Sequence, residues 1–293
     1  MKRSIYLASA AVLPLSLVSS VVAGMNEDLA SCTVAQGRAS ADACTRVMNS
    51  GRLPDEQRYI GHFNRGMGYH HAGEYVSALA DFNEALKLHP RFARGYQARA
   101  FLKQDLGAFN GALADLAHVI ALSPTDWFGF YYRALILRDR GDYQGAIADL
   151  DRAYRLMPDE NRIELLRALV LSDEGKIDAA RLMINKVIAQ GRDDSAGFYA
   201  RASVAFKEGR LDAASDDLAR VLKLGQDVDV AHILLGRVLE ARGDTGSAIE
   251  HYRRALAEPD RSFEGRSPRK LARERLSVLQ RGAEVPPDDG KDK

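Results

Sequence analysis

The sequence predicts an all-α protein, a right-handed solenoid of about six helical hairpins, and two regularities lead to this fold class. A glycine recurs every 34 residues, at Gly73, Gly107, Gly141, Gly175, Gly209 and Gly243. An alanine stands five residues after each of them, at Ala78, Ala112, Ala146, Ala180, Ala214 and Ala248. A fixed period of this length is the signature of a repeat protein, so the fold follows from one repeat.

The third repeat, "WFGFYYRALILRDRGDYQGAIADLDRAYRLMP" at residues 127–158, shows how each element arises. Apolar residues recur every three to four positions in two blocks, which predicts two amphipathic helices. Gly141 ends the first helix and Pro158 stops the second. Ala146 lets the two helices approach closely, because a larger side chain there would cost about 1–3 kcal/mol through overpacking. A single hairpin cannot bury its apolar face, so neighbouring repeats are expected to stack.

The chain is expected to begin with a cleaved signal peptide at residues 1–24. Met1, Lys2 and Arg3 give a basic start, an apolar run follows, and small residues precede a cleavage site near Ala23 or Gly24. Export would leave a mature chain without a transmembrane segment.

Both cysteines of the chain, Cys32 and Cys44, fall in a segment expected to form an N-terminal half-repeat cap at residues 25–58. Residues 40–51 resemble a second helix, with Cys44 in the place that Phe82 holds in the first repeat. A lipid anchor at Cys32, a redox or metal pair, and a disulfide are the three interpretations. In an exported chain we expect the Cys32–Cys44 disulfide, which would stabilise a short hairpin by about 3 kcal/mol.

The C-terminal end is predicted to close the stack. Residues 261–282 contain a capping helix, for which Ser267 is the N-cap and Pro268 the first helical position. Apolar residues on one face of this helix would cover the last repeat. Residues 283–293 are charged and contain prolines, which predicts a disordered tail.

The repeat resembles the tetratricopeptide repeat (TPR) family. The resemblance rests on the 34-residue spacing, on the glycine and alanine series, on Tyr69 and Phe82 in the first repeat, and on a helix-ending proline in the first three repeats. It covers residues 59–260. In the fourth and fifth repeats Arg192 and Gln226 replace the proline, and the preceding Gly191 and Gly225 are expected to cap the helices. The sequence of the first repeats resembles that of exported proteobacterial TPR proteins. This resemblance implies a periplasmic location in a Gram-negative bacterium, with membrane association as a further option.

A second periodic series combines arginines on the first helices with aspartates on the second. The arginines are Arg65, Arg99, Arg133, Arg167 and Arg201, and the aspartates are Asp81, Asp115, Asp149 and Asp217. We expect an ion-pair ladder between the first and second helices rather than catalytic sites, because the pattern recurs from repeat to repeat, whereas a catalytic site would be unique. The sixth repeat has Leu235 and His251 at these two places, so both partners are lost together.

The sequence indicates no enzyme, metal site or cofactor. Metalloprotease, serine-hydrolase and P-loop motifs are absent. His62, His70 and His71 cluster along the chain, but no carboxylate or thiol is placed to complete a metal site. Forty-one Lys and Arg residues balance 40 Asp and Glu residues, so nothing suggests nucleic-acid binding.

The resemblance implies a protein or peptide partner, held in a concave groove lined by the first helices. The matching positions hold Phe63, Met67, Arg94, Gln97, Phe101, Phe128, Tyr131, Tyr132 and Tyr199, with Leu135, Leu165, Ile233 and Arg237 as further members. Aromatic and arginine side chains are frequent binding hot spots. The sequence therefore predicts a non-enzymatic protein–protein interaction scaffold in the bacterial periplasm. The alternative is a lipoprotein-like, outer-membrane-associated component of an envelope assembly complex, tethered through Cys32.

Overall fold

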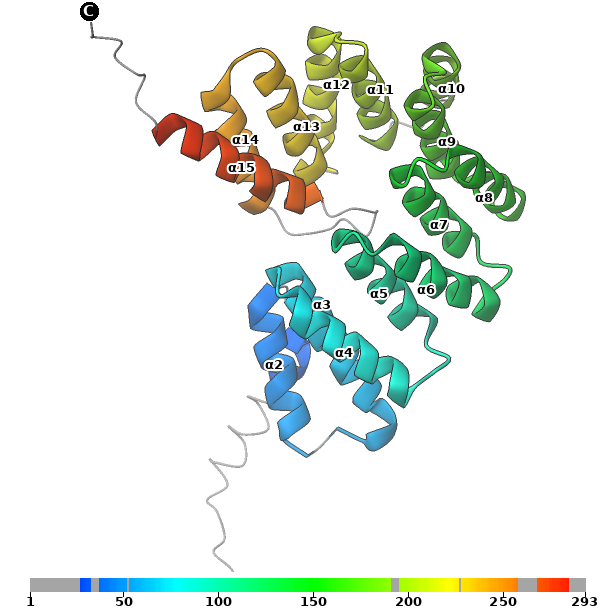
Figure 1. Cartoon of the computed structure of the whole chain (residues 1–293), viewed down its shortest axis with the longest axis vertical. Coiled ribbons are helices and arrows are strands. Elements are labelled where there is room, and N and C mark those ends of the chain that lie inside the picture. Colours follow the sequence, from blue (N-terminus) through cyan, green and yellow to red (C-terminus); the bar gives the residue numbers. More distant parts are fainter. Residues whose placement is uncertain are drawn as a thin grey trace, which may run out of the picture. The chain divides into compact units, whose positions relative to one another are not determined.

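The computed structural model describes residues 27–32, 37–51, 53–190, 195–226, 228–257 and 268–284. Across these ranges every regular element is helical (Figure 1), which confirms the predicted all-α class. The chain divides into two compact units, residues 1–89 (unit 1) and residues 90–293 (unit 2), each with its own set of packed helices. The predicted signal peptide lies outside the described residues, as does most of the predicted tail.

Unit 1 contains the N-terminal cap and the first repeat. A short helix at residues 27–32 is followed by α2 (Gly37–Asn49), a 3₁₀ turn η1 (Asp55–Gln57), α3 (Arg58–Ala72) and α4 (Tyr75–Leu88). Helix α3 packs against both α2 and α4. A disulfide joins Cys32 to Cys44 across a Cα–Cα distance of 4.6 Å, and both cysteines are buried with Ala43 and Val47. The expected disulfide is therefore part of the small core under α2.

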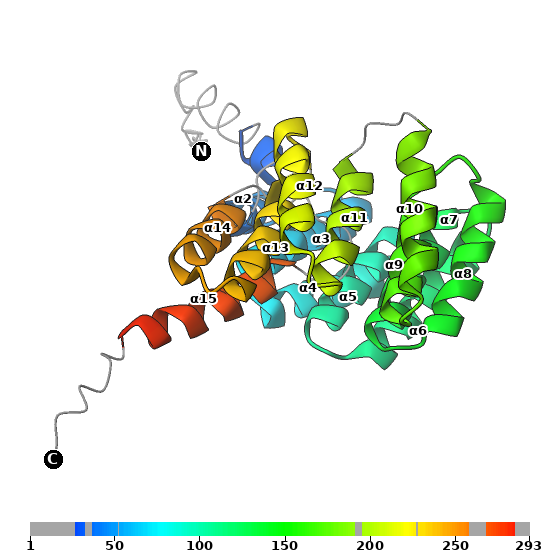
Figure 2. The ribbon, with the colours of Figure 1, turned by 90° about the horizontal axis from the view of Figure 1, so that it is seen from above.

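Unit 2 contains repeats two to six and the capping helix. Its hairpins follow one another in chain order (Figures 1 and 2), and each first helix packs mainly on its own second helix. The first helices also contact one another, α7 with α9, α9 with α11 and α11 with α13. The helices are α5 (Ala93–Asp105), α6 (Phe109–Leu122), α7 (Trp127–Asp139), α8 (Tyr143–Leu156), α9 (Asn161–Asp173), α10 (Ile177–Ala189), α11 (Ser195–Lys207), α12 (Leu211–Leu224), α13 (Val228–Ala241), α14 (Thr245–Ala257) and α15 (Pro268–Glu284).

The periodic glycines make the turn inside each hairpin. Gly73 has a φ of 80° as C-cap of α3, and the other five glycines of the series also have positive φ. A residue without Cβ adopts this left-handed conformation at little cost, which explains the series. Gly225 likewise ends α12 with a φ of 70°, so a glycine cap does replace the missing proline there. Gly191 lies outside the described residues.

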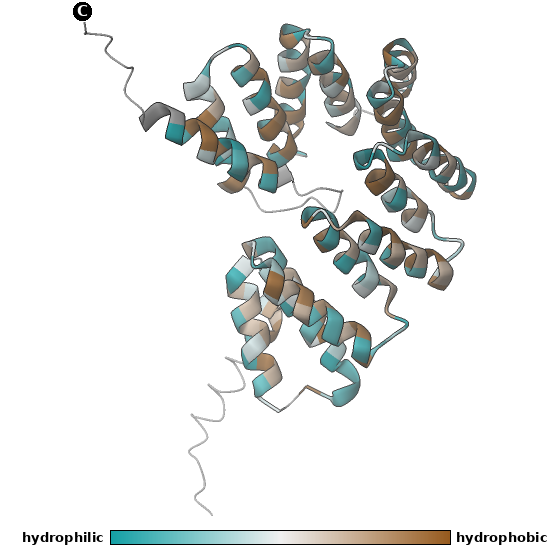
Figure 3. Ribbon diagram, in the orientation of Figure 1, coloured by the Kyte–Doolittle hydropathy of each residue, from teal (hydrophilic) through white to brown (hydrophobic). Residues whose placement is uncertain are grey.

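Each hairpin is closed by a small residue on the first helix against a larger one on the second. In repeats two to five, alanines with no exposed surface share a core cluster with a fully buried Leu or Ile of the second helix, for example Ala134 and Leu150. In the first repeat the small residue is Gly66, and a Cβ there would come within 2.8 Å of the Phe82 ring. The first repeat thus lacks the alanine methyl group on its first helix and has a larger, aromatic side chain at the matching position of its second helix. Both brown and teal residues lie along each helix (Figure 3), as expected of amphipathic helices.

Helix α15 covers the last hairpin. It packs against α13 and α14 through the buried Ala272 and the half-buried Leu271, Leu276 and Leu279. It is described from Pro268 to Glu284, two residues beyond the predicted end, and the predicted N-cap Ser267 lies outside the described residues. The Lys270 ammonium group donates a hydrogen bond of 2.6 Å to the carbonyl oxygen of Asp105, at the end of α5.

Candidate binding surface on the first helices

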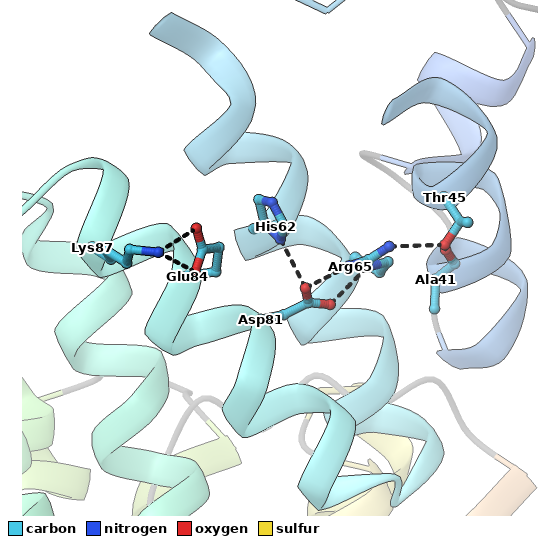
Figure 4. Close-up of polar contacts among 7 residues, drawn as sticks. All are labelled: Ala41, Thr45, His62, Arg65, Asp81, Glu84 and Lys87. Carbon is cyan, nitrogen blue, oxygen red and sulfur yellow. Dashed lines mark hydrogen bonds and ion pairs between the residues drawn. The ribbon is translucent and has the colours of Figure 1, made fainter. Parts of the chain in front are cut away.

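The predicted arginine–aspartate ladder is present in both units. In the first repeat, Arg65 donates two hydrogen bonds of 2.7 Å to the two carboxylate oxygens of Asp81 (Figure 4). The Nδ1 atom of His62 lies 2.9 Å from the same carboxylate. Such paired bonds suit the planar guanidinium group, and they raise the pKa of Arg65 above its usual value. The same arrangement recurs as Arg99–Asp115, Arg133–Asp149 and Arg201–Asp217.

The fourth repeat keeps its arginine but changes partner. Met183 stands where the other repeats have an aspartate, so Arg167 of α9 has no ladder carboxylate on its own second helix. Its guanidinium group instead lies 2.7 Å from Asp151, on α8 of the preceding repeat. The ladder therefore also links neighbouring hairpins.

The sixth repeat replaces the ladder with a histidine pair. His232 of α13 and His251 of α14 lie with their Nδ1 atoms 2.9 Å apart. They occupy the positions of His62 and Asp81 in the first repeat, while Leu235 takes the place of Arg65. Burial, and then the positive charge of Arg254, lower the pKa of His251. One ring nitrogen must donate and the other accept, so the contact requires at least one neutral imidazole.

The predicted groove residues of unit 1 are Phe63 and Met67 on α3. Phe63 is buried, with its ring centroid 6.1 Å from that of Phe82, whereas Met67 is half-buried. The side chain of Phe63 thus belongs to the hairpin core.

In unit 2 five aromatic residues of α5 and α7 form one group, the aromatic cluster, and four of them were predicted from the sequence. Four of the rings are buried and Phe128 is half-buried. The rings of Phe101 and Tyr132 meet edge-on with their centroids 4.8 Å apart. The rings of Trp127 and Phe128 are stacked with their centroids 4.1 Å apart. The cluster comprises Phe101, Trp127, Phe128, Tyr131 and Tyr132.

Arg162, at the start of α9, caps this cluster. Its guanidinium carbon lies 5.2 Å from the Trp127 ring centroid and 5.7 Å from that of Phe128. A cation over aromatic faces is attracted by their quadrupoles. Sequence reasoning missed both Arg162 and Trp127; Arg162 follows Arg94 and Phe128 at the 34-residue spacing, a signal that could have found it.

The remaining predicted positions lie elsewhere on the first helices of unit 2. Arg94 is exposed and Gln97 half-buried, both on α5, and Tyr199 is half-buried on α11. Tyr199 packs against the core of repeats five and six, and it is close enough to Arg138 of α7 to influence that guanidinium group. The structure therefore groups the α5 and α7 aromatics and leaves Tyr199 near charged residues.

Those charged residues form a polar ribbon that sequence reasoning missed. Its members lie near the C-terminal ends of the first helices α5, α7, α9, α11 and α13, and on α15. The Gln104 amide donates a hydrogen bond of 2.6 Å to the Asp139 carboxylate. Arg138 and Lys207 both donate to the carboxylate of Asp173. The Nε atom of Arg275 donates to the Glu240 carboxylate at 3.1 Å. The ribbon comprises Gln104, Arg138, Asp139, Asp173, Lys207, Glu240 and Arg275. The signal for it is a pair of complementary polar residues 34 or 35 positions apart.

The described residues include no group of three or more His, Cys, Asp or Glu side chains that could hold a metal ion. The predicted histidines have other contacts: His62 faces Asp81, and the His70 ring lies against Tyr75. A cavity of about 330 Å³ lies among α10, α11 and α12, where Arg181 and Arg201 are ion-paired with Glu208 and Asp217. In the described part of the chain, no helix is both long and apolar enough to cross a membrane.

Comparison with known proteins places these features in a family context. Three sequence models described as tetratricopeptide repeat match residues 59–92, residues 97–161 and 199–262, and residues 137–204. Comparison of the sequence with curated proteins found no match. A tetratricopeptide repeat protein from Parabacteroides merdae is similar in structure, with a TM-score of 0.65 and 19% identity over 89% of this chain and 98% of that one. TTC0263, a TPR protein from Thermus thermophilus, has a TM-score of 0.52 and 25% identity over 62% of this chain and 98% of that one.

Proposed function

We propose that this chain, which belongs to the tetratricopeptide repeat family, is a non-enzymatic scaffold that holds a segment of a partner protein on the first helices of unit 2. The aromatic cluster with Arg162 is the observation that carries the proposal. Phe128 keeps part of its ring accessible, and Arg162 places a cation beside it. Buried neighbours such as Tyr132 hold the Phe128 ring in place, so little side-chain freedom is lost on binding.

Part of the predicted groove is accessible to a partner and part of it is buried. Phe101, Tyr131 and Tyr132 support the surface from below because they are buried, whereas Phe128, Arg94 and Gln97 remain accessible to a partner. These three accessible residues lie on α5 and α7, so one segment could meet all of them.

A photo-crosslinking experiment tests the surface. Replacing Phe128 with a photo-reactive phenylalanine analogue should give covalent adducts with a partner from an envelope extract. The matched control is the same replacement at Tyr154, an exposed aromatic residue on the second helix α8. Adducts from position 154 but not from position 128 would contradict the proposed surface.

We propose further that the chain is exported to the periplasm of a Gram-negative bacterium after cleavage near Ala23 or Gly24. The apolar N-terminus supports this location, and so does the Cys32–Cys44 disulfide, because such bonds persist in oxidising compartments. The same disulfide disfavours the lipid-anchored alternative, since a cysteine in a disulfide has no thiol left for a thioether. Intact mass of protein from the periplasmic fraction should show the shortened chain with the Cys32–Cys44 disulfide and without a lipid on Cys32. A full-length chain confined to the cytoplasm would overturn this proposal.

A further inference from the structure

The first-helix surface of unit 2 gathers positive charge near its C-terminal end. Arg138 of α7 and Lys207 of α11 converge on a single carboxylate, that of Asp173 on α9. Arg237 of α13, a predicted groove residue, lies with its guanidinium carbon 4.7 Å from the centroid of the Phe206 ring, next to Lys207 in sequence. Two cations therefore contact one carboxylate, and Arg237 lies close enough to Lys207 for their charges to interact.

The other carboxylates nearby already have partners. Glu240, which is close to Arg237, accepts hydrogen bonds from Arg275 and from the hydroxyl group of Tyr252. Asp139 accepts from Gln104. The neutral Gln104 amide leaves the charge of Asp139 in place beside Arg138. With Asp139, Asp173 and Glu240 counted against Arg138, Lys207, Arg237 and Arg275, the region keeps one positive charge in excess.

The electrostatics of Lys207 show that these cations act on one another. Burial, and then the charges of Arg138 and Arg237, lower the pKa of Lys207 even with Asp173 in contact. Like charges held together repel, and an added anion reduces that repulsion. Lys207 keeps 40% of its side chain exposed and Arg237 is exposed, so a ligand can reach both.

We propose that the cation group of Lys207, Arg237 and Arg138 binds acidic side chains within the partner segment that the scaffold holds, which deepens the proposed function and rests on it. Charge complementarity selects an acidic segment.

Peptide selection on the whole chain tests this specificity without a known partner. Random peptides with amidated C-termini are selected on immobilised wild-type protein and on a Lys207→Met/Arg237→Gln variant. We expect Asp and Glu to be enriched on the wild type and that enrichment to disappear on the variant. The matched control is Lys186→Met/Arg253→Gln, which removes the same charges from exposed positions on the second helices α10 and α14.

Affinity measurements on one selected acidic peptide complete the test. Replacing its acidic residues with Gln or Asn should weaken binding to the wild type at least about tenfold, because charge-assisted hydrogen bonds are lost. The same replacement should have little effect on binding to Lys207→Met/Arg237→Gln. Since the peptide change leaves the protein intact, the result does not depend on how well the variant folds.

The outcomes separate this inference from the proposed function. Peptides selected without acidic residues, yet requiring Phe128, would overturn the acidic specificity and leave the scaffold intact. Failure to select any peptide that depends on the first helices would count against both. Equal loss of binding in the control variant would show that net charge, not this site, attracts the peptides.

Discussion

The first and last hairpins solve the same packing problem with different chemistry. In the α3–α4 hairpin a buried carboxylate, Asp81, is held by Arg65 and His62. In the α13–α14 hairpin the corresponding helices meet through His232 and His251. The first contact joins the opposite charges of Arg65 and Asp81, while the second depends on a neutral imidazole. The periodic sequence therefore sets where a polar contact falls, and the residues at that place decide its response to pH.

The two ends of the chain are also secured differently. The N-terminal cap is tied covalently by the Cys32–Cys44 disulfide. The C-terminal helix α15 is held by apolar contacts and by the Arg275–Glu240 ion pair. Within the last hairpin, burial and the hydrogen bond to Glu240 raise the pKa of Tyr252, so its hydroxyl group stays a donor.

The largest effect should come from removing the buried carboxylate of the first hairpin. Asp81→Asn leaves Arg65 without its anionic partner, and we expect a loss of about 3–5 kcal/mol in the free energy of unfolding. Urea denaturation measures this loss. Asp42→Asn is the control, since the Arg38–Asp42 pair is exposed and an exposed ion pair adds little to stability. Equal losses from the two substitutions would remove the basis for the comparison.

Loss of the disulfide should follow in size. Cys32→Ser/Cys44→Ser opens a loop with a sequence separation of 12, which the chain-entropy model values at about 3 kcal/mol. Denaturation with and without reductant measures the difference. The wild type should lose stability in reductant, and the double variant should not respond. A reductant effect that persists in the variant would have another origin.

The contact of Gly66 with Phe82 gives a third test. Gly66→Ala should cost about 1–3 kcal/mol, because the new methyl group would meet the Phe82 ring at 2.8 Å. Adding Phe82→Leu reproduces the alanine–leucine pairing of the middle repeats and should recover part of the loss. A double-mutant cycle measures the coupling, and additive losses would show that the two sites do not constrain each other.

The smallest effect is the pH response of the histidine pair. Because the pKa of His251 is lowered in the folded state, the unfolded chain binds more protons between the folded pKa and 6.5. Its contribution to stability is therefore present above pH 6.5 and is lost as the pH falls through the folded pKa. Leu235→Arg/His251→Asp restores the ladder and should reduce this acid loss. Thermal unfolding of the wild type and the variant over a pH series measures this. If both proteins lose stability equally as the pH falls, the histidine pair is not responsible.

The sequence by itself determined the architecture inside each hairpin. The 34-residue period placed the turn glycines, and it predicted the ladder partners because Arg65 and Asp81 recur at one spacing in several repeats. The two helices of a hairpin are joined by a short turn, so their mutual register depends on local sequence. The pairing of Cys32 with Cys44 was predicted for the same reason.

Contacts between successive hairpins were decided only by the tertiary structure. It directed Arg167 to Asp151, brought Arg138 and Lys207 together on Asp173, and buried Phe101, Tyr131 and Tyr132 while leaving Phe128 accessible. These outcomes depend on how far a side chain reaches into the next repeat and on the size of its neighbours. A periodic pattern marks which residues lie on the first helices, but packing between repeats determines which of them a partner can touch.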